Sequence, residues 1–207
     1  MAWLSGTIIV VVSARSQGTF QNLGFEAARI ILVNNSLHDI ATTNALPGWS
    51  AFFGANQLST ITYNDAAAIP RVGLYGSNAF GFIESFTVLL NNGGSISQTG
   101  LVPTNAESLR FKASQPGLTP LSVSLGGQSL SYTAISSGPN YTLYGADISR
   151  FAGQTASLTF LSPSLDFIDD IEFSPQVIPE PSSLALCLCG GLLLGGWKLS
   201  EQCVLPV

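Results

Sequence analysis

The sequence is short of charged residues and of cysteine, and each shortage narrows what the protein can do. Only 9% of the 207 residues are charged, against a usual value of ~25%. A net charge of −5 supplies no basic stripe to neutralise phosphates, which argues against nucleic acid as a partner. The three cysteines are Cys187, Cys189 and Cys203. Residues 1–186 can therefore contain neither a disulfide nor a thiolate zinc site.

Motifs typical of common enzymes are missing as well. The single histidine, His38, lies in a polar segment that predicts a loop. The chain has no Gly-x-Ser-x-Gly elbow, metalloprotease helix or phosphate loop. Glycoside hydrolysis needs two carboxylates about 5–9.5 Å apart, and no spacing pairs any two of Asp65, Glu84 and Asp147. We expect a protein that is not an enzyme, with a glycoside hydrolase as the least favoured alternative.

Residues 17–175 show the alternation of a β-protein. Leu109, Phe111 and Ala113 alternate with Arg110 and Lys112, and the same period of two recurs at 85–88, 121–125 and 157–160. A period of two places the apolar side chains on one face of a sheet. Turn signals at 93–94, 115–117, 126–127 and 137–140 separate these runs. We therefore expect an all-β, antiparallel β-sandwich, with at most one helical turn at 148–152.

The chain ends in a proline-rich linker at 176–183, an apolar segment at 184–199 and a tail at 200–207. Pro179 and Pro181 flank Glu180 and end any preceding strand. The run after them, up to Lys198, predicts a hydrophobic transmembrane helix. A buried C-terminal helix of the globular body is the alternative. At the other end, residues 1–16 are signal-like, because an apolar run precedes the small residues of Val12-Ser13-Ala14.

The motif Pro179-Glu180-Pro181, followed by an apolar run and a cation, resembles the PEP-CTERM sorting tail of exported Gram-negative bacterial proteins. The resemblance implies an exosortase-type processing enzyme as a partner. It also implies transient anchoring in the inner membrane through the C-terminal helix, followed by transfer to the cell envelope, the surface or the extracellular matrix.

Segments near the two ends of residues 17–175 carry a second resemblance. The segments 22–26, 46–49 and 167–173 are similar to the opening and closing strands of jelly-roll modules of the galactose-binding and carbohydrate-binding kind. That likeness implies a structural calcium held by Glu26 and Asp169. We expect Asp169 to share a face with Phe167, Ile171 and Phe173, where an uncompensated carboxylate is costly. The alternative is that Asp169 accepts hydrogen bonds from backbone N–H groups or a hydroxyl. No cofactor is required in either case.

Three functions stay open from the sequence. The first is a non-catalytic module for adhesion or structural association, the second a glycan-binding module with a row of exposed aromatics, and the third the hydrolase. We expect Trp49 to be a core residue and Asp166, Asp170 and Glu172 to form a solvated acidic rim. The other aromatic candidates for a ligand surface are Phe52, Phe53, Tyr63, Tyr75, Phe80, Phe82, Tyr132, Tyr141 and Tyr144.

Overall fold

The computed structural model describes residues 19–33, 35–65, 70–76, 85–114 and 120–178. The signal-like segment 1–16, Pro179, Glu180, Pro181 and the apolar segment 184–199 lie outside these residues, and their expected roles stay predictions. The same holds for Phe80 and Phe82, and for the turn expected at 115–117. Within the described residues, no helix is long and apolar enough to cross a membrane.

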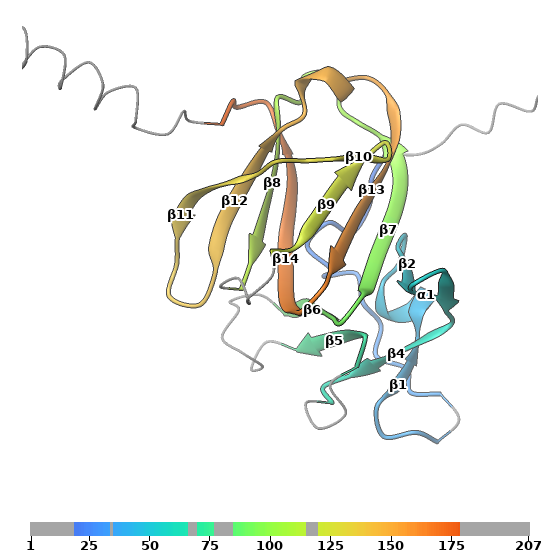
Figure 1. The fold of residues 1–207 in the computed structure, drawn as a ribbon. Helices are drawn as coiled ribbons and strands as arrows, with labels where there is room; N and C mark the ends of the chain where they lie inside the picture. Colours follow the sequence, from blue (N-terminus) through green and yellow to red (C-terminus); the bar gives the residue numbers. More distant parts are fainter. Residues whose placement is uncertain (1–18, 34, 66–69, 77–84, 115–119, 179–207) are drawn as a thin grey trace, which may run out of the picture.

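The body is an all-β sandwich of two sheets, as the alternation predicts (Figure 1). The first sheet has eight strands, in the order β1 (Asp39–Ala41), β4 (Thr60–Tyr63), β5 (Val72–Gly76), β6 (Phe86–Asn91), β14 (Leu165–Ser174), β8 (Ser108–Ala113), β12 (Thr142–Asp147) and β11 (Thr133–Ser137). The second has six, in the order β10 (Gln128–Ser129), β9 (Ser122–Leu125), β13 (Thr155–Ser162), β7 (Gly94–Leu101), β2 (Ser50–Phe53) and β3 (Asn56–Leu58).

Two departures from a purely antiparallel β-protein appear. Strands β4 and β5 pair in parallel, with Thr62 opposite Gly73. Two short helical turns, α1 (Thr42–Ala45) and η1 (Ser149–Phe151), join strands. The second turn lies within the expected 148–152, whereas nothing in the sequence pattern predicts the first.

The expected alternation is confirmed in β8, β9 and β13. Leu109 and Phe111 in β8 are fully buried, and so are Leu125 in β9 and Leu158 and Phe160 in β13. The intervening serines and threonines of β9 and β13 are at least partly exposed. In contrast, β6 is buried on both faces, because Val88 and Leu90 belong to the core between the sheets and Leu89 packs with Tyr75 and Phe167 on the other face. The prediction that each strand has one buried and one exposed face is therefore wrong for β6.

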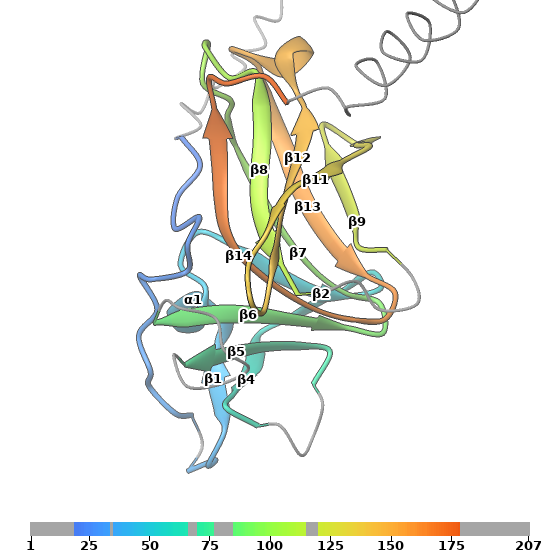
Figure 2. The same cartoon turned by 90° about the vertical axis from the view of Figure 1, so that its left-hand side faces the viewer.

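Strand β14 is where the eight-stranded sheet bends. Its first residues, 165–168, pair with β6, and residues 168–174 pair with β8. The register shifts between Asp169 and Glu172, and Asp170 has φ of +47°. An extra residue of this kind is a β-bulge, which bends a strand and increases its twist. Figure 2 shows the result, with β5 and β6 running across the upright strands β14 and β8.

Aromatic side chains hold the two sheets together. Phe111 of β8 and Phe160 of β13 meet edge to face, with ring centroids 5.3 Å apart. Trp49, which precedes β2, lies 6.5 Å from Phe160 and 5.8 Å from Phe25. The chain of rings therefore joins the opening segment to both layers. Trp49 is 4% exposed, which confirms the expectation that it is a core residue.

Replacing Phe160 with alanine tests this link between the sheets. The change removes a fully buried ring and leaves a cavity, so we expect the free energy of unfolding to fall by about 3–5 kcal/mol. Leu161→Ala is the matched control, because the next residue of β13 faces outward and is 37% exposed. Urea unfolding of both variants gives the measurement. Equal losses in the two variants would contradict the assignment of inner and outer faces.

Candidate functional site

The opening segment lies beside the closing strand, and this brings Glu26 and Asp169 to the same part of β6. Ile171 N–H donates to the Leu23 carbonyl at 3.1 Å. Phe86 N–H donates to Glu26 Oε1 at 3.0 Å, and the next side chain, Thr87 Oγ1, donates to Asp169 Oδ2 at 3.1 Å. The two carboxylates therefore bind consecutive residues of one strand.

The two carboxylates differ in exposure, and each has protein partners. Glu26 is exposed, whereas Asp169 is 1% exposed. Asp169 Oδ1 also accepts the Asp170 N–H at 2.8 Å, as the alternative without a metal requires. No cluster of three or more histidine, cysteine, aspartate or glutamate residues occurs among the described residues. A calcium ion here would need backbone carbonyl oxygens as further ligands, and calcium binding by Glu26 and Asp169 stays a prediction.

The bulge in β14 corrects the expected faces of the closing strand. Asp169 does lie on the side of Phe167, which packs with Tyr75 and Leu89 on the outer face of the eight-stranded sheet. Ile171 belongs to the core between the sheets, and Phe173 packs against it. The expectation that all four side chains share one face is wrong, because the extra residue after Asp169 inverts the alternation.

Lys112 supplies the positive charge that no neighbour in sequence provides. It lies directly opposite Asp169 in the register of β8 and β14, and its ammonium group forms an ion pair with Asp170. It also lies over the ring of Tyr141, at 4.9 Å from the centroid. Directly opposed residues share a face of a sheet. The buried Asp169 therefore lies beside Lys112, which is distant in the sequence and close in the fold.

The expected solvated acidic rim exists only in part. Glu172 is exposed and Asp170 is half-buried, but Asp166 is 1% exposed and accepts a hydrogen bond from Ser162 Oγ at 2.6 Å. Burial raises the pKa of Asp166, and the bond from Ser162 opposes the rise. The placement of Asp166 on the rim is wrong, because the side chain turns back onto β13 instead of into solvent.

The aromatic candidates do not form an exposed row. Among the described residues, Phe53 is the one exposed aromatic, at 41%. The guanidinium carbon of Arg71 lies 4.6 Å from the centroid of its ring. Tyr75 is buried, and its hydroxyl donates to the Asp65 carbonyl at 2.8 Å. Burial and the neighbouring Tyr144 and Asp166 raise the pKa of Tyr132 to about 12. Most of the aromatic surface therefore serves packing.

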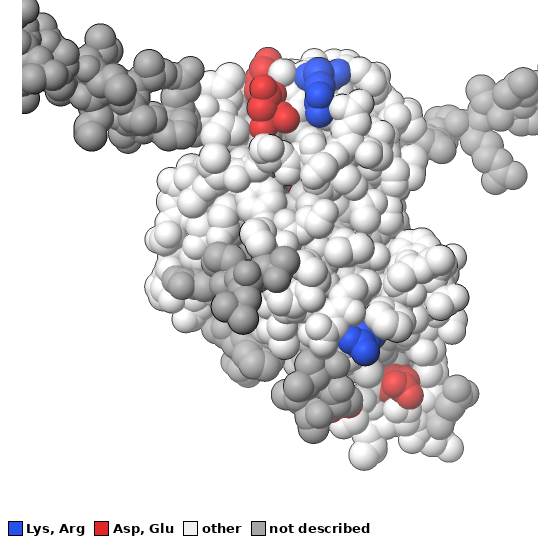
Figure 3. Space-filling model, in the orientation of Figure 1, with Lys and Arg blue, Asp and Glu red and all other residues white. Residues whose placement is uncertain are grey.

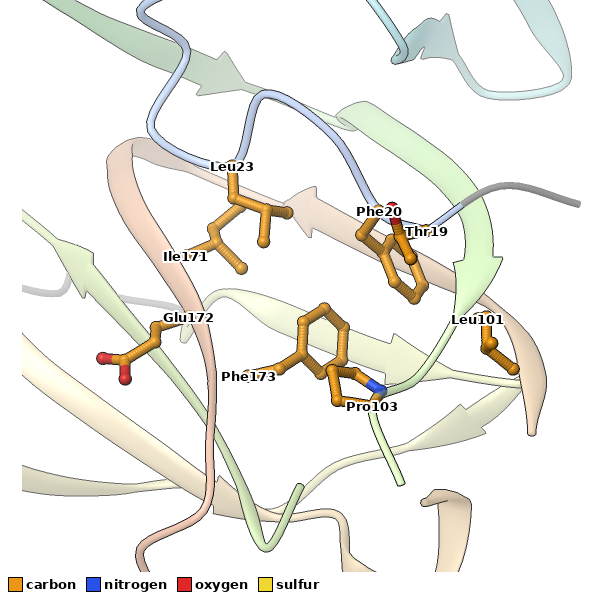
Figure 4. A pocket seen from close by; sticks show the side chains of 8 residues that line it. All are labelled: Thr19, Phe20, Leu23, Leu101, Pro103, Ile171, Glu172 and Phe173. Atoms are coloured by element: carbon orange, nitrogen blue, oxygen red, sulfur yellow. The ribbon is translucent and has the colours of Figure 1, made fainter. Parts of the chain in front are cut away.

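Three hollows are described: one between the opening segment, the end of β7 and β14, one between the opening segment and β7, and one beside α1, β2 and β3. The one in Figure 4 has a volume of about 280 Å³. The rings of Phe20 and Phe173 lie 4.7 Å apart at its floor, and the Glu172 carboxylate points away from them. A second, of about 210 Å³, is lined by Gln98 and Thr99 of β7, by Thr19 and Gln21 of the opening segment and by Gly48.

The third hollow is the largest of these, about 550 Å³, and it is neutral. It is lined by Thr42, Thr43, Trp49, Ser50, Gln57, Leu58 and Ser59. Its hydroxyl and amide groups offer hydrogen bonds without any charge, and the half-buried Leu58 adds an apolar side chain, whereas the ring of Trp49 packs in the core.

Charge is divided unequally between the two sheets. All eight charged residues that lie in the described strands belong to the eight-stranded sheet: Asp39, Arg110, Lys112, Asp147, Asp166, Asp169, Asp170 and Glu172. The six strands of the other sheet contain none. Figure 3 shows one face of the molecule on which charged side chains appear only near the upper edge and at the lower right. Such a neutral surface is suited to neutral partners.

Comparisons with known proteins give no match: no family model, no curated protein and no solved structure corresponds to the chain.

Calcium binding can be tested by stability. If Glu26 and Asp169 hold an ion, millimolar Ca²⁺ raises the melting temperature, EDTA reverses the rise, and Asp169→Asn abolishes it, because a ligand of the folded state stabilises that state. Glu107→Gln, an exposed glutamate remote in sequence, is the control and should keep the response. A melting temperature that is the same with Ca²⁺ and with EDTA would contradict the metal site.

The buried carboxyl of Asp166 predicts a pH dependence of stability. Its pKa is raised above 3.8 in the folded state. Its stabilising contribution is therefore complete below 3.8 and is lost as the pH rises through the folded pKa. Asp166→Asn cannot ionise, so the stability of the variant minus that of the wild type should increase between about pH 4 and about pH 7. Urea unfolding across this range gives the difference, and a constant difference would contradict the prediction.

Proposed function

We propose that the protein is an exported, non-catalytic β-sandwich of the cell envelope or extracellular matrix, where it serves adhesion or structural association. The observation that carries this proposal is the division of charge, because one whole sheet presents no charged residue in its described strands. A neutral polar face associates by hydrogen bonds and apolar contact, and it attracts neither nucleic acid nor highly charged partners.

The C-terminal sequence supports the location. The motif Pro179-Glu180-Pro181 and the apolar run behind it resemble a sorting tail, so the proposal includes an exosortase-type enzyme as the processing partner. In this proposal the apolar segment is a helix that anchors the chain transiently in the inner membrane, and the jelly-roll-like body projects from it. The body has no cysteine and gains no disulfide from the exported compartment, and a chain of this length can bury a full core without one.

A glycan-binding module is the second candidate. The neutral hollow of about 550 Å³ favours it, since threonine and serine residues, Gln57 and Trp49 line the hollow together. The aromatic side chains count against it, because those of the described residues form no exposed row on which sugar rings could stack. A hydrolase would need two facing carboxylates in a cleft, and the only acidic residue lining the hollows described above is Glu172.

Substitution in the sorting motif tests the location. With Pro179→Ala, Glu180→Ala and Pro181→Ala combined, we expect the C-terminal segment to stay attached and the protein to stay in the membrane fraction. Mass spectrometry of the C-terminus and fractionation of the cells give the measurement. Pro163→Ala combined with Glu107→Ala, at exposed positions of the body, is the control and should leave processing intact. Normal processing and release of the motif variant would refute the sorting proposal.

A further inference from the structure

Hydroxyl groups form a continuous row across the outer face of the six-stranded sheet. The register places Ser129 of β10 opposite Ser124 of β9, Ser124 opposite Thr159 of β13, Thr159 opposite Ser97 of β7, and Ser97 opposite Ser50 of β2. Five adjacent strands thus contribute one hydroxyl each. With strands about 4.8 Å apart, the row is roughly 19 Å long.

The row is on the solvent side of the sheet. The neighbouring residues Val123, Leu158, Ile96 and Ala51 are buried in the core between the sheets, so the alternation turns the hydroxyls outward. Ser129 is exposed, and the other four residues of the row are half-buried, as small side chains in the middle of a sheet are. Figure 1 shows β9, β13 and β7 side by side along this face.

Two neighbouring members of the row, Ser97 and Thr159, bond to each other, which fixes their positions. Ser97 Oγ lies 3.0 Å from Thr159 Oγ1 and 3.0 Å from Ser157 Oγ, and it donates to the Leu158 carbonyl at 3.2 Å. A hydroxyl offers one donor and two acceptor lone pairs, so these three bonds saturate Ser97, whereas Thr159 keeps lone pairs for an outside partner. Side chains held in this way lose little entropy when a ligand binds.

A second row beside the first adds apolar contact. In the register, Leu161 of β13 lies opposite Ser95 of β7, and Ser95 lies opposite Phe52 of β2. Leu161 is 37% exposed and Phe52 is half-buried. Ser122 and Gln57 complete this second row, so two apolar side chains lie among polar ones, and none of the described strands of this face carries a charge.

The row also leads into the largest neutral hollow. Ser50, its last member, lines the hollow of about 550 Å³ together with Trp49 and Thr43. Gln57 Nε2 donates to Ser50 Oγ at 3.4 Å and lines the same hollow. The hydrogen-bonding surface thus continues from an open, extended row into a recess.

We propose that this hydroxyl row and the hollow beside it bind a neutral polysaccharide. This inference rests on the proposed association through a neutral surface and names its partner. A chain of pyranose rings has hydroxyl edges and apolar C–H faces and no charge, which matches an uncharged face of hydroxyls with the apolar side chains of Leu161 and Phe52 among them. A charged polymer would leave its ionic groups without partners on this face, and that costs affinity.

The test uses the full chain, purified in mild detergent, and suspensions of cellulose, curdlan and agarose as probes. We expect retention on at least one of them that is unchanged between about 50 and 500 mM NaCl, because no ionic contact is involved. Thr159→Lys and Ser124→Lys should each lower retention about tenfold or more by placing an unpaired charge in the contact. Thr159→Val, which removes only the hydroxyl, should lower it less.

A matched control uses the other sheet. Ser136→Lys places the same charge on exposed β11 of the eight-stranded sheet and should leave retention at the wild-type level. Thermal unfolding of each variant shows that the fold is intact. Retention on none of the three polysaccharides, retention that the row variants do not change, or a dimer that Thr159→Lys dissolves would overturn the inference. If cells still sort the protein to the matrix in those cases, the proposed function stands and only its partner is wrong.

Discussion

The structure depends on the contact between the inner faces of two sheets, and a chain of aromatic rings makes that contact specific. Phe25, Trp49, Phe160 and Phe111 follow one another from the opening segment through both layers. Aromatic pairs prefer tilted and edge-to-face geometries and add to the energy of simple burial. The rings thereby fix how the sheets face each other, and with it which side chains of each strand point outward.

The alternation of apolar and polar residues predicts a strand and its buried face correctly wherever one face of the strand is buried and the other is exposed. The alternation of Leu109 and Phe111 with Arg110 and Lys112 predicts β8 correctly, and the buried Trp49 was also expected. The alternation predicts the faces of a strand wrongly where distant parts of the chain decide which side chains are buried. Strand β6 has neighbours on both edges and cover on both faces, and the bulge after Asp169 inverts the faces of β14. The consecutive apolar residues Val88, Leu89 and Leu90 do interrupt the period of two in β6, whereas the bulge in β14 leaves no such mark.

The candidate site shows the same limit. The resemblance to jelly-roll modules points to Glu26 and Asp169, and the fold brings both to β6. The ion pair of Lys112 with Asp170 joins residues far apart in the sequence, so no spacing could indicate it. The hydroxyl row was equally hidden, because a scattering of serines and threonines becomes a row only when five strands are placed in order and register. Its signal in the sequence is the alternation of serine with valine and leucine, as in β9.

The position of β14 has a mechanical consequence. Strand β14 has β6 on one side and β8 on the other, and the chain leaves it toward Val177. Tension applied to the chain at Val177 therefore enters the sandwich along the axis of an internal strand. The antiparallel ladder with β8 holds residues 168–174 and the ladder with β6 holds residues 165–168, and both are loaded in shear, so many hydrogen bonds must break before the strand can slide. A body attached to its surroundings through this end resists extraction more strongly than one held by an edge strand, which can be peeled away one bond at a time.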